Sequence, residues 1–366
     1  MEAGTRINMH LDKKKKIMIC IAPALLIVFS LANPAAAYIE ISDFFSDFTS
    51  SDVTIVSGEN LQGRAVFELF FSGSLVESHE VPFNARAGEP VYKVILWETK
   101  PQHDYYTAKL SLYDEGKLLV SKTYPVSYGT VALPSFHVVD FSPTNTGVQL
   151  LLRPFNPSAV DIKIELLDNN DVVYSKTRED VSLVTSAEIR MLWPFLLVNN
   201  ERYTVRAKIY THRLYASPLI NTYTAFFIAN RDVEILPDDV EVDDYGASVT
   251  IRGRSQVPFD GSILVITKNR ATNETRTYTA KLEEILVSGK EDTAGIVWRD
   301  LAPGTYDVVI LAVDHENVAL DRYETVFRIP EETGAAETPG TKSTPGFAAL
   351  VSMIIILAAS RRLKGA

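Results

Sequence analysis

Short stretches rich in β-branched and aromatic residues alternate with turn residues from Tyr38 to about Pro330, and no long helical pattern interrupts them. In the stretch 159–166, AVDIKIEL, aliphatic residues occupy every second position from Val160 onward and polar residues lie between them. A period of two is typical of a strand that buries one face of a sheet. Turn-forming residues separate such stretches, as in 72–74 (SGS), 114–117 (DEGK) and 168–171 (DNND). The pattern therefore predicts an all-β protein built from hairpins.

The same pattern occurs three times. Each copy ends an apolar stretch with one of the three tryptophans, and a tyrosine that opens an alternating strand follows eight to ten residues later. These pairs are Trp97 and Tyr106, Trp193 and Tyr203, and Trp298 and Tyr306. The tryptophans are 96 and 105 residues apart, a spacing that resembles the roughly 100 residues of an immunoglobulin-like sandwich. We therefore predict three tandem immunoglobulin-like β-sandwiches.

The aromatic pairs have two interpretations. As structural devices, the tryptophans fill the cores and the tyrosine hydroxyls bond to backbone groups; we favour this interpretation because the neighbouring residues are apolar. The alternative is an exposed aromatic row that stacks on sugars. Segment 301–306, LAPGTY, resembles the turn before a late strand in fibronectin-type and adhesion-related sandwiches, which supports the fold alone. Phe44, Phe45 and Phe48 are likewise either core residues of the first strand or an exposed apolar patch.

The repeats predict sandwiches over residues 38–130, 131–230 and 231–330. After Pro330 the sequence lacks core-forming residues, and residues 331–344 are rich in Thr, Pro and Gly. This composition is typical of a tether, whose hydroxyl groups are candidates for glycans.

The amino-terminal segment has the pattern of a secretory signal peptide. Four lysines, 13–16, precede the apolar run 17–31, and Ala35 and Ala37 frame a small-residue cleavage site. We predict that residues 1–37 are this signal. An uncleaved amino-terminal anchor is the alternative.

The carboxyl-terminal segment combines a short motif, an uncharged apolar run of 14 residues and a basic end. The residues that define it are Pro345, Gly346, Phe347, Arg361 and Arg362. As a helix the run extends about 21 Å, less than the roughly 30 Å hydrocarbon core of a bilayer. Segment 345–366 resembles the PGF-CTERM sorting signal of archaeal surface proteins. The resemblance implies that an archaeosortase-like enzyme cuts near the motif and that a lipid replaces the tail, with a retained transmembrane helix as the alternative.

The net charge limits the classes of binding partner, and the cysteine content limits the disulfides that the chain can form. The 366 residues carry a formal net charge of −10, and removing both terminal segments takes away eight basic and only two acidic residues. A surface this acidic is a poor partner for nucleic acid. The one cysteine, Cys20, lies in the predicted signal peptide, so the predicted mature chain forms no internal disulfide and depends on packing.

The sequence carries no recognisable catalytic motif. It contains no HExxH, GxSxG or GxxxxGK[ST], and no two of its six histidines have metal-ligand spacing. We predict no enzymatic activity and no cofactor, although a site assembled from distant residues is not recognisable in this way.

Two polar stretches are candidate sites. The acidic run 238–244 contains Asp238, Asp239, Asp243 and Asp244, which are candidate calcium ligands; the alternative is a strand that exposes carboxylates to water, because valines alternate with them. Asn273 begins an N-glycosylation sequon, Asn-Glu-Thr, in a polar stretch typical of a hairpin tip.

Together these features predict an exported, non-enzymatic structural or adhesion protein, anchored at the cell surface by its carboxyl end. Its expected partners are the membrane, the processing enzyme, and surface-layer proteins or glycans. The alternative is a ligand-binding or accessory module of a surface transporter or hydrolase complex. An enzyme of unrecognised type is a third hypothesis.

Overall fold

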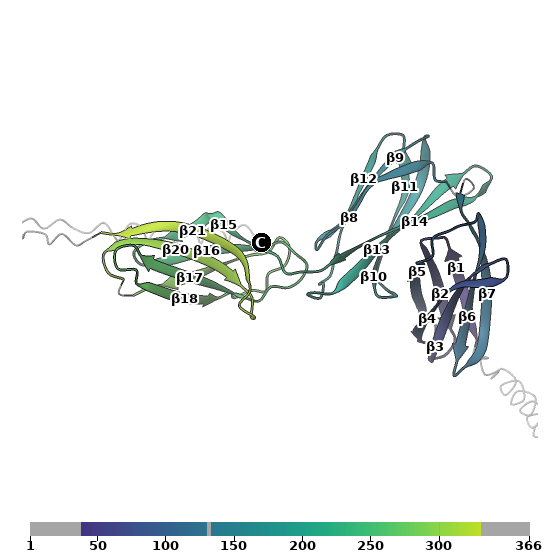
Figure 1. The fold of residues 1–366 in the computed structure, drawn as a ribbon, viewed down its shortest axis with the longest axis horizontal. Helices are drawn as coiled ribbons and strands as arrows, with labels where there is room; N and C mark the ends of the chain where they lie inside the picture. The colour runs from purple at the N-terminus through teal and green to yellow at the C-terminus, as the bar shows by residue number, and fades with distance from the viewer. Residues whose placement is uncertain (1–37, 130–132, 300, 331–366) are drawn as a thin grey trace, which may run out of the picture. The chain divides into compact units, whose positions relative to one another are not determined.

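The computed structural model describes residues 38–129, 133–299 and 301–330, and the regular elements within these ranges are 21 β-strands (Figure 1). The predicted all-β class is confirmed. The same ranges contain no helix with the length and apolar character needed to cross a membrane. The predicted signal peptide with Ala35 and Ala37, the tether, and the sorting segment 345–366 lie outside the described residues.

The strands fall into three groups of seven with one topology. In each group the first, second and fifth strands form one sheet, and the third, fourth, sixth and seventh form the other. This is the strand arrangement of an immunoglobulin-like sandwich. We call the groups the first, second and third sandwiches.

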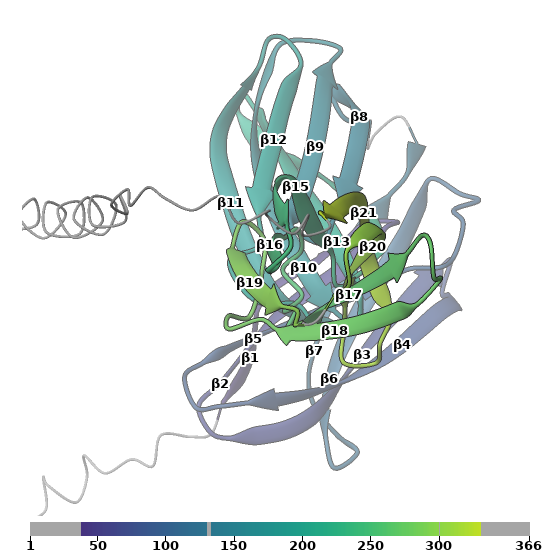
Figure 2. The same cartoon turned by 90° about the vertical axis from the view of Figure 1, so that its left-hand side faces the viewer.

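The first sandwich comprises β1 (Ile39–Ser46), β2 (Ser50–Ser57), β3 (Leu61–Phe71), β4 (Ser74–Ala85), β5 (Pro90–Leu96), β6 (Tyr105–Asp114) and β7 (Lys117–Ser127). The second comprises β8 (Phe136–Pro143), β9 (Gly147–Pro154), β10 (Ser158–Asp168), β11 (Asp171–Leu183), β12 (Ala187–Leu192), β13 (Arg202–Arg213) and β14 (Ala216–Ile228). Figure 2 shows β12, β9 and β8 side by side as one of its sheets.

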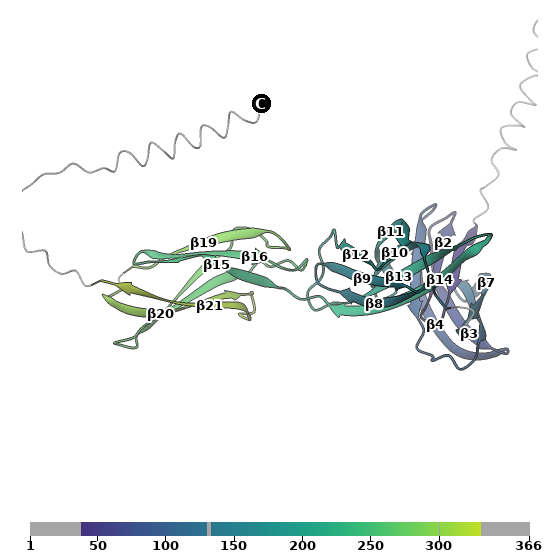
Figure 3. The same cartoon turned by 90° about the horizontal axis from the view of Figure 1, so that it is seen from above.

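The third sandwich comprises β15 (Val233–Val242), β16 (Gly246–Gly253), β17 (Ser262–Asn269), β18 (Thr275–Lys281), β19 (Glu291–Val297), β20 (Gly304–Val313) and β21 (Ala319–Ile329). Its two sheets appear in Figure 3 as one layer with β15, β16 and β19 and another with β20 and β21.

The three sandwiches form two compact units. The described part of the first unit is 38–129, 133–234, 252–260 and 284–291, and it contains the first and second sandwiches. The second unit, 235–251, 261–283, 292–299 and 301–330, contains most of the third. The pairing of two sandwiches in one unit is not apparent from the repeat pattern.

The predicted turns connect antiparallel strands. Ser72 and Gly73, with φ of 48° and 83°, join β3 to β4, and Glu115 and Gly116, with φ of 45° and 86°, join β6 to β7. Two successive residues with positive φ make the turn that matches the twist of a hairpin, and glycine adopts that conformation without strain. Asn169 has the same positive φ in the turn between β10 and β11.

The aromatic pairs are structural, as predicted. Trp97, Trp193 and Trp298 are 7%, 1% and 4% exposed, and their tyrosine partners are also buried. The Tyr106 and Tyr203 hydroxyls accept hydrogen bonds from the backbone N–H groups of Gln102 and Val198, and the Tyr306 hydroxyl donates to the Ala302 carbonyl. Each tyrosine thereby fixes the loop that leads into its own strand, and the exposed-row alternative is wrong for these rings.

The phenylalanines of the first strand belong to the interior. Phe44 and Phe45 are 3% and 5% exposed, and Phe48, which follows β1 and is partly buried, packs against Tyr106 with ring centroids 4.7 Å apart. The alternative of an exposed apolar patch at these three rings is therefore wrong.

Candidate functional site

The first and second sandwiches meet along a shared sheet edge. Sheet β1-β2-β5 continues into β11-β10-β13-β14 to form one seven-stranded sheet. At the junction, Lys93 of β5 lies opposite Asp171 of β11 and forms an ion pair with it. The backbone N–H of Val94 donates to the Asn170 carbonyl at 3.0 Å, and the Asn170 side-chain amide donates back to the Val94 carbonyl at 2.9 Å.

Behind this edge, the two parts of the seven-stranded sheet, β1-β2-β5 and β11-β10-β13-β14, bury polar side chains against each other. On β13, Val205 and Ala207 point into the core of the second sandwich, while the alternate residues Arg206 and Lys208 are 0% and 2% exposed although they lie outside that core. Asp52 on β2 is 9% exposed beside the core residue Val53 of the first sandwich. The residues that period-two alternation turns away from each core therefore meet one another.

Arg206 connects three strands across this interface. Its Nη1 donates to Asp52 Oδ2 at 2.8 Å, and its Nε donates to Glu165 Oε2 at 2.7 Å. Lys208 Nζ donates to both oxygens of Asp52, at 3.0 and 2.9 Å, and lies 4.2 Å from the ring centroid of Phe45. Buried charges are tolerated when they are paired and hydrogen-bonded in this way. Arg206 and Lys208 thus pair with Asp52 and Glu165, and Lys163 adds a further ion pair with Glu165 at 2.7 Å.

A turn of the first sandwich adds a second polar contact. Asp47 follows β1, and its Oδ1 accepts the backbone N–H groups of Thr49 and Ser50 at 2.8 and 2.9 Å. Its Oδ2 accepts the backbone N–H and the hydroxyl of Thr222, on β14 of the second sandwich, at 2.8 and 2.7 Å. Thr222 Oγ1 also lies 3.0 Å from Ser50 Oγ. Asp47 therefore organises its own turn and binds the neighbouring sandwich with one carboxylate.

The turn position of Asp47 recurs in the other sandwiches. Asp243 accepts the N–H groups of Tyr245 and Gly246 in the corresponding turn, and its carbonyl accepts the indole N–H of Trp298. Thr144 has this place in the second sandwich, where its hydroxyl accepts Thr146 N–H and its carbonyl accepts the Trp193 indole. Asp243 is exposed, so the turn is a shared device and the contact with Thr222 is specific to Asp47.

The interface shifts the pKa values of its two aspartates in opposite directions. Burial raises the pKa of Asp47, because its hydrogen-bond donors offset only part of the desolvation. Burial also acts to raise the pKa of Asp52, but the charges of Arg206 and Lys208 outweigh it and hold that pKa below the ordinary value. Asp52 is thus ionised at neutral pH as part of a paired network. Such a network favours one alignment of the first and second sandwiches, because any other alignment leaves a buried charge unpaired.

The residues predicted as sites lie elsewhere. Asp238, Asp239, Asp243 and Asp244 are exposed on β15 and the turn after it, and calcium binding there remains a prediction. Asn273 is exposed in the turn between β17 and β18, with a positive φ of 58°, a position open to a glycan. Among the described residues, the side chains with metal-ligand spacing are instead Asp161, Asp180 and His212.

Sequence reasoning missed the interface residues. Arg206, Lys208 and Glu165 occupy polar positions of alternating strands, where the pattern ordinarily indicates a solvated face. The sequence pattern predicts Asp171 only as a turn residue of the stretch 168–171. No local signal distinguishes these charges from exposed ones, since their partners lie on distant strands.

Replacing Asp47 by alanine should destabilise the first unit more than the same change at Asp243 destabilises the second. Both variants lose the turn acceptor, but Asp47→Ala also leaves the Thr222 backbone N–H without the acceptor that Asp47 supplies. Unsatisfied buried donors cost about 1–3 kcal/mol. Urea unfolding monitored by tryptophan fluorescence measures both losses, and equal losses would show that the contact with Thr222 contributes nothing.

Acid should weaken the first unit through Asp52. A carboxylate whose folded pKa is depressed stabilises the fold fully above the unfolded-state pKa, about 3.9, and loses that contribution as pH falls through the lower folded-state value. The unfolding midpoint of Asp52→Asn should therefore lie below that of the wild type at pH 7 and approach it below about pH 3. For Asp47 the pH dependence has the opposite sign, because its raised pKa favours the protonated folded state. The unfolding midpoint of the wild type should therefore rise relative to that of Asp47→Asn as pH falls from 7 toward 4. A pH-independent gap in the first comparison would contradict the assignment to Asp52.

Comparison with known proteins gives likeness of structure only. No family model matches the sequence, and no curated protein matches it. Among solved structures, the tetra-tandem repeat in the extending region of a large adhesion protein is 13% identical, covers 80% of this chain and 74% of its own, and has a TM-score of 0.26. The chicken interferon gamma receptor alpha chain is 13% identical, covers 54% of this chain and 100% of its own, and has a TM-score of 0.33. The strand order in the sheets of the present chain defines it as a protein of tandem immunoglobulin-like sandwiches, two of which lie in one compact unit.

Proposed function

We propose that this chain is a non-enzymatic structural or adhesion protein of the cell surface, exported by its amino-terminal signal and held at its carboxyl end. The observation that carries the structural role is the buried interface centred on Arg206. An interface that pairs the charges of Arg206, Lys208, Asp52 and Glu165 across the first and second sandwiches resists bending between them. A stiff pair of sandwiches is suited to hold a contact surface away from its attachment point.

The surface address rests on the sequence features at both ends. The signal-peptide pattern with Ala35 and Ala37 implies export. Pro345, Gly346 and Phe347, followed by the apolar run and the basic end, resemble the archaeal sorting signal and so imply processing by an archaeosortase-like enzyme. Glycosylation of Asn273 belongs to the same proposal, and its exposed position in a turn supports it.

Surface proteolysis of intact cells of the source organism, followed by mass spectrometry, tests the address. Peptides from residues 38–330 should be released from intact cells, and the membrane fraction should yield a carboxyl end near Pro345. Recovery of the full chain in the cytosol, with residues 1–37 and 345–366 still attached, would overturn the proposal.

A second candidate function is that of a ligand-binding module of a surface transporter or hydrolase complex. It is favoured by a cavity of about 820 Å³ in the first unit, lined by Thr49 of the first sandwich and by Phe136, His137, Thr222 and Tyr223 of the second. Its volume is in the range of small-molecule sites. Affinity purification from solubilised envelope separates the candidates: surface-layer proteins support the structural role, and a stoichiometric transporter or hydrolase supports the module.

A further inference from the structure

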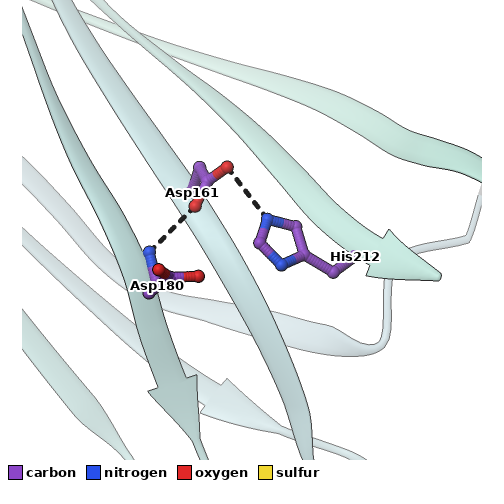
Figure 4. Close-up of side chains that lie close together, drawn as sticks. All are labelled: Asp161, Asp180 and His212. Carbon is purple, nitrogen blue, oxygen red and sulfur yellow. Dashed lines mark hydrogen bonds and ion pairs between the residues drawn. The ribbon is translucent and has the colours of Figure 1, made fainter. Parts of the chain in front are cut away.

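A group of metal-ligating side chains lies on the second sandwich, apart from the acidic run 238–244. Asp180, Asp161 and His212 come from the adjacent strands β11, β10 and β13, and their side chains converge in Figure 4. By alternation they share the sheet face that carries Glu165 and Arg206, but Asp180 and His212 are exposed where those residues are buried. This face of the sheet is thus buried at the interface with the first sandwich and exposed to solvent at the three metal-ligating residues.

The distances suit coordination of one ion. His212 Nε2 lies 2.9 Å from Asp161 Oδ2, and one ligand atom from each of the three residues lies within 4.8 Å of the other two. Ligand atoms around a tetrahedral zinc ion, at bonds of about 2.0–2.2 Å, are separated by roughly 3.3–3.6 Å. Binding of an ion would therefore widen the separation of His212 Nε2 and Asp161 Oδ2 slightly and bring Asp180 closer, through rotation of the exposed His212 and Asp180 side chains.

Asp161 is already oriented for this role. Its second oxygen, Oδ1, accepts the backbone N–H of Asp180 at 2.9 Å, which fixes the carboxylate plane. The pairing of β10 with β11 is irregular between Val160 and Ile162, and Asp180 has a φ of 53° there. An outer hydrogen bond that orients a ligand is a regular feature of protein metal sites.

The charge of the group favours a cation. Asp161 and Asp180 place two carboxylates beside a single imidazole. Lys163, the cation next along the same face of β10, is paired with Glu165 at 2.7 Å. The ion pair between Asp161 and His212 therefore leaves the second carboxylate uncompensated, and a divalent ion between the three ligands balances both.

We propose that Asp161, Asp180 and His212 bind one divalent transition-metal ion of the zinc type. One imidazole nitrogen and two carboxylate oxygens suit zinc, whereas calcium and magnesium prefer oxygen ligands alone. Three protein ligands leave a coordination position open to water or to a side chain of another molecule. The inference is independent of the proposed surface function.

Calorimetric titration of the full-length, chelator-treated chain with zinc chloride at pH 7.5, in excess magnesium, tests the site. One saturable site per chain is expected. His212→Gln and Asp180→Asn should each weaken binding by at least about tenfold, the lower end of what perturbing a metal site causes. His79→Gln is the matched control, because His79 pairs with Glu77 at 2.6 Å but joins no group of three ligands within the described part of the chain; this variant should bind zinc as the wild type does.

The two variants keep the test decisive. Asp180→Asn changes an exposed side chain and leaves the pair between Asp161 and His212 in place, so its loss of binding separates a metal site from a simple ion pair. Thermal melting verifies that each variant is folded. Absence of a saturable site in the wild type, or binding undiminished in both variants, would overturn the proposal.

Discussion

Replacing Arg206 by alanine should lower the free energy of unfolding of the first unit by about 3–5 kcal/mol, the usual cost of removing one partner from a buried charge network. The variant leaves Glu165 with Lys163 alone and Asp52 with Lys208 alone. Both carboxylates are almost fully buried. The protein must then keep a desolvated charge, protonate it or open the interface, and each route costs free energy. Urea unfolding of the full chain at neutral pH measures the loss.

Arg64→Ala is the matched control. Arg64 forms an ion pair with Glu80 at 2.7 Å in the first sandwich, with both side chains about half exposed. Exposed pairs of this kind contribute little, because water and salt screen them. If Arg206→Ala proved no more destabilising than Arg64→Ala, the buried network would not hold the two sandwiches together.

Replacing Trp193 by alanine should cost about 3–5 kcal/mol, as is typical when a large aromatic residue is removed from a core. Trp193 is 1% exposed, stacks on Phe227 with ring centroids 6.3 Å apart, and donates its indole N–H to the Thr144 carbonyl. The variant loses the packing of the second core and the bond that holds the turn before β9. Differential scanning calorimetry should show the transition of the first unit at a lower temperature.

The neighbouring residue provides the control for this experiment. Leu192 precedes Trp193 in sequence but is 72% exposed, so Leu192→Ala should leave the transition almost unchanged. Similar melting temperatures for the two variants would contradict the assignment of Trp193 as the core residue of the second sandwich.

The sequence predicts well those features of the fold that local physics determines. Strand 158–168 is recognisable because Ile162, Ile164 and Leu166 alternate with polar residues. The three tryptophan–tyrosine pairs reveal the repeat because each core needs one large aromatic residue and one anchored loop. The hairpin turns follow from residues such as Gly73 and Gly116, which adopt positive φ without strain.

The buried interface between the first and second sandwiches cannot be predicted from sequence patterns in the same way. Arg206 and Lys208 occupy positions that alternation assigns to solvent, yet Asp52, more than 150 residues earlier in the chain, closes over them. Asp47 and Asp243 have the same turn role, and only the surroundings of Asp47 bury its carboxylate. Whether a polar sheet face meets water or another sheet depends on how whole sandwiches dock, and period-two patterns carry no information about docking.

The metal-ligating group is not predictable from the sequence for a related reason. No two histidines have metal-ligand spacing, and the ligands that come together are one histidine and two aspartates from three strands. Strand order in the sheet brings them within reach, and the irregular pairing near Ile162 turns Asp180 toward Asp161. Both determinants are three-dimensional.

The central claim is that the first and second sandwiches form one rigid body through the Arg206 network. Spin labels at Leu75→Cys and Val184→Cys test it most directly, since these positions are 54% and 66% exposed and lie on the first and second sandwiches. Cys20 is replaced by serine so that only these two sites are labelled. Pulsed electron-electron double resonance on the full chain should give one narrow distance distribution, which broadens in Arg206→Ala. A broad distribution in the chain with Arg206 intact would contradict the account.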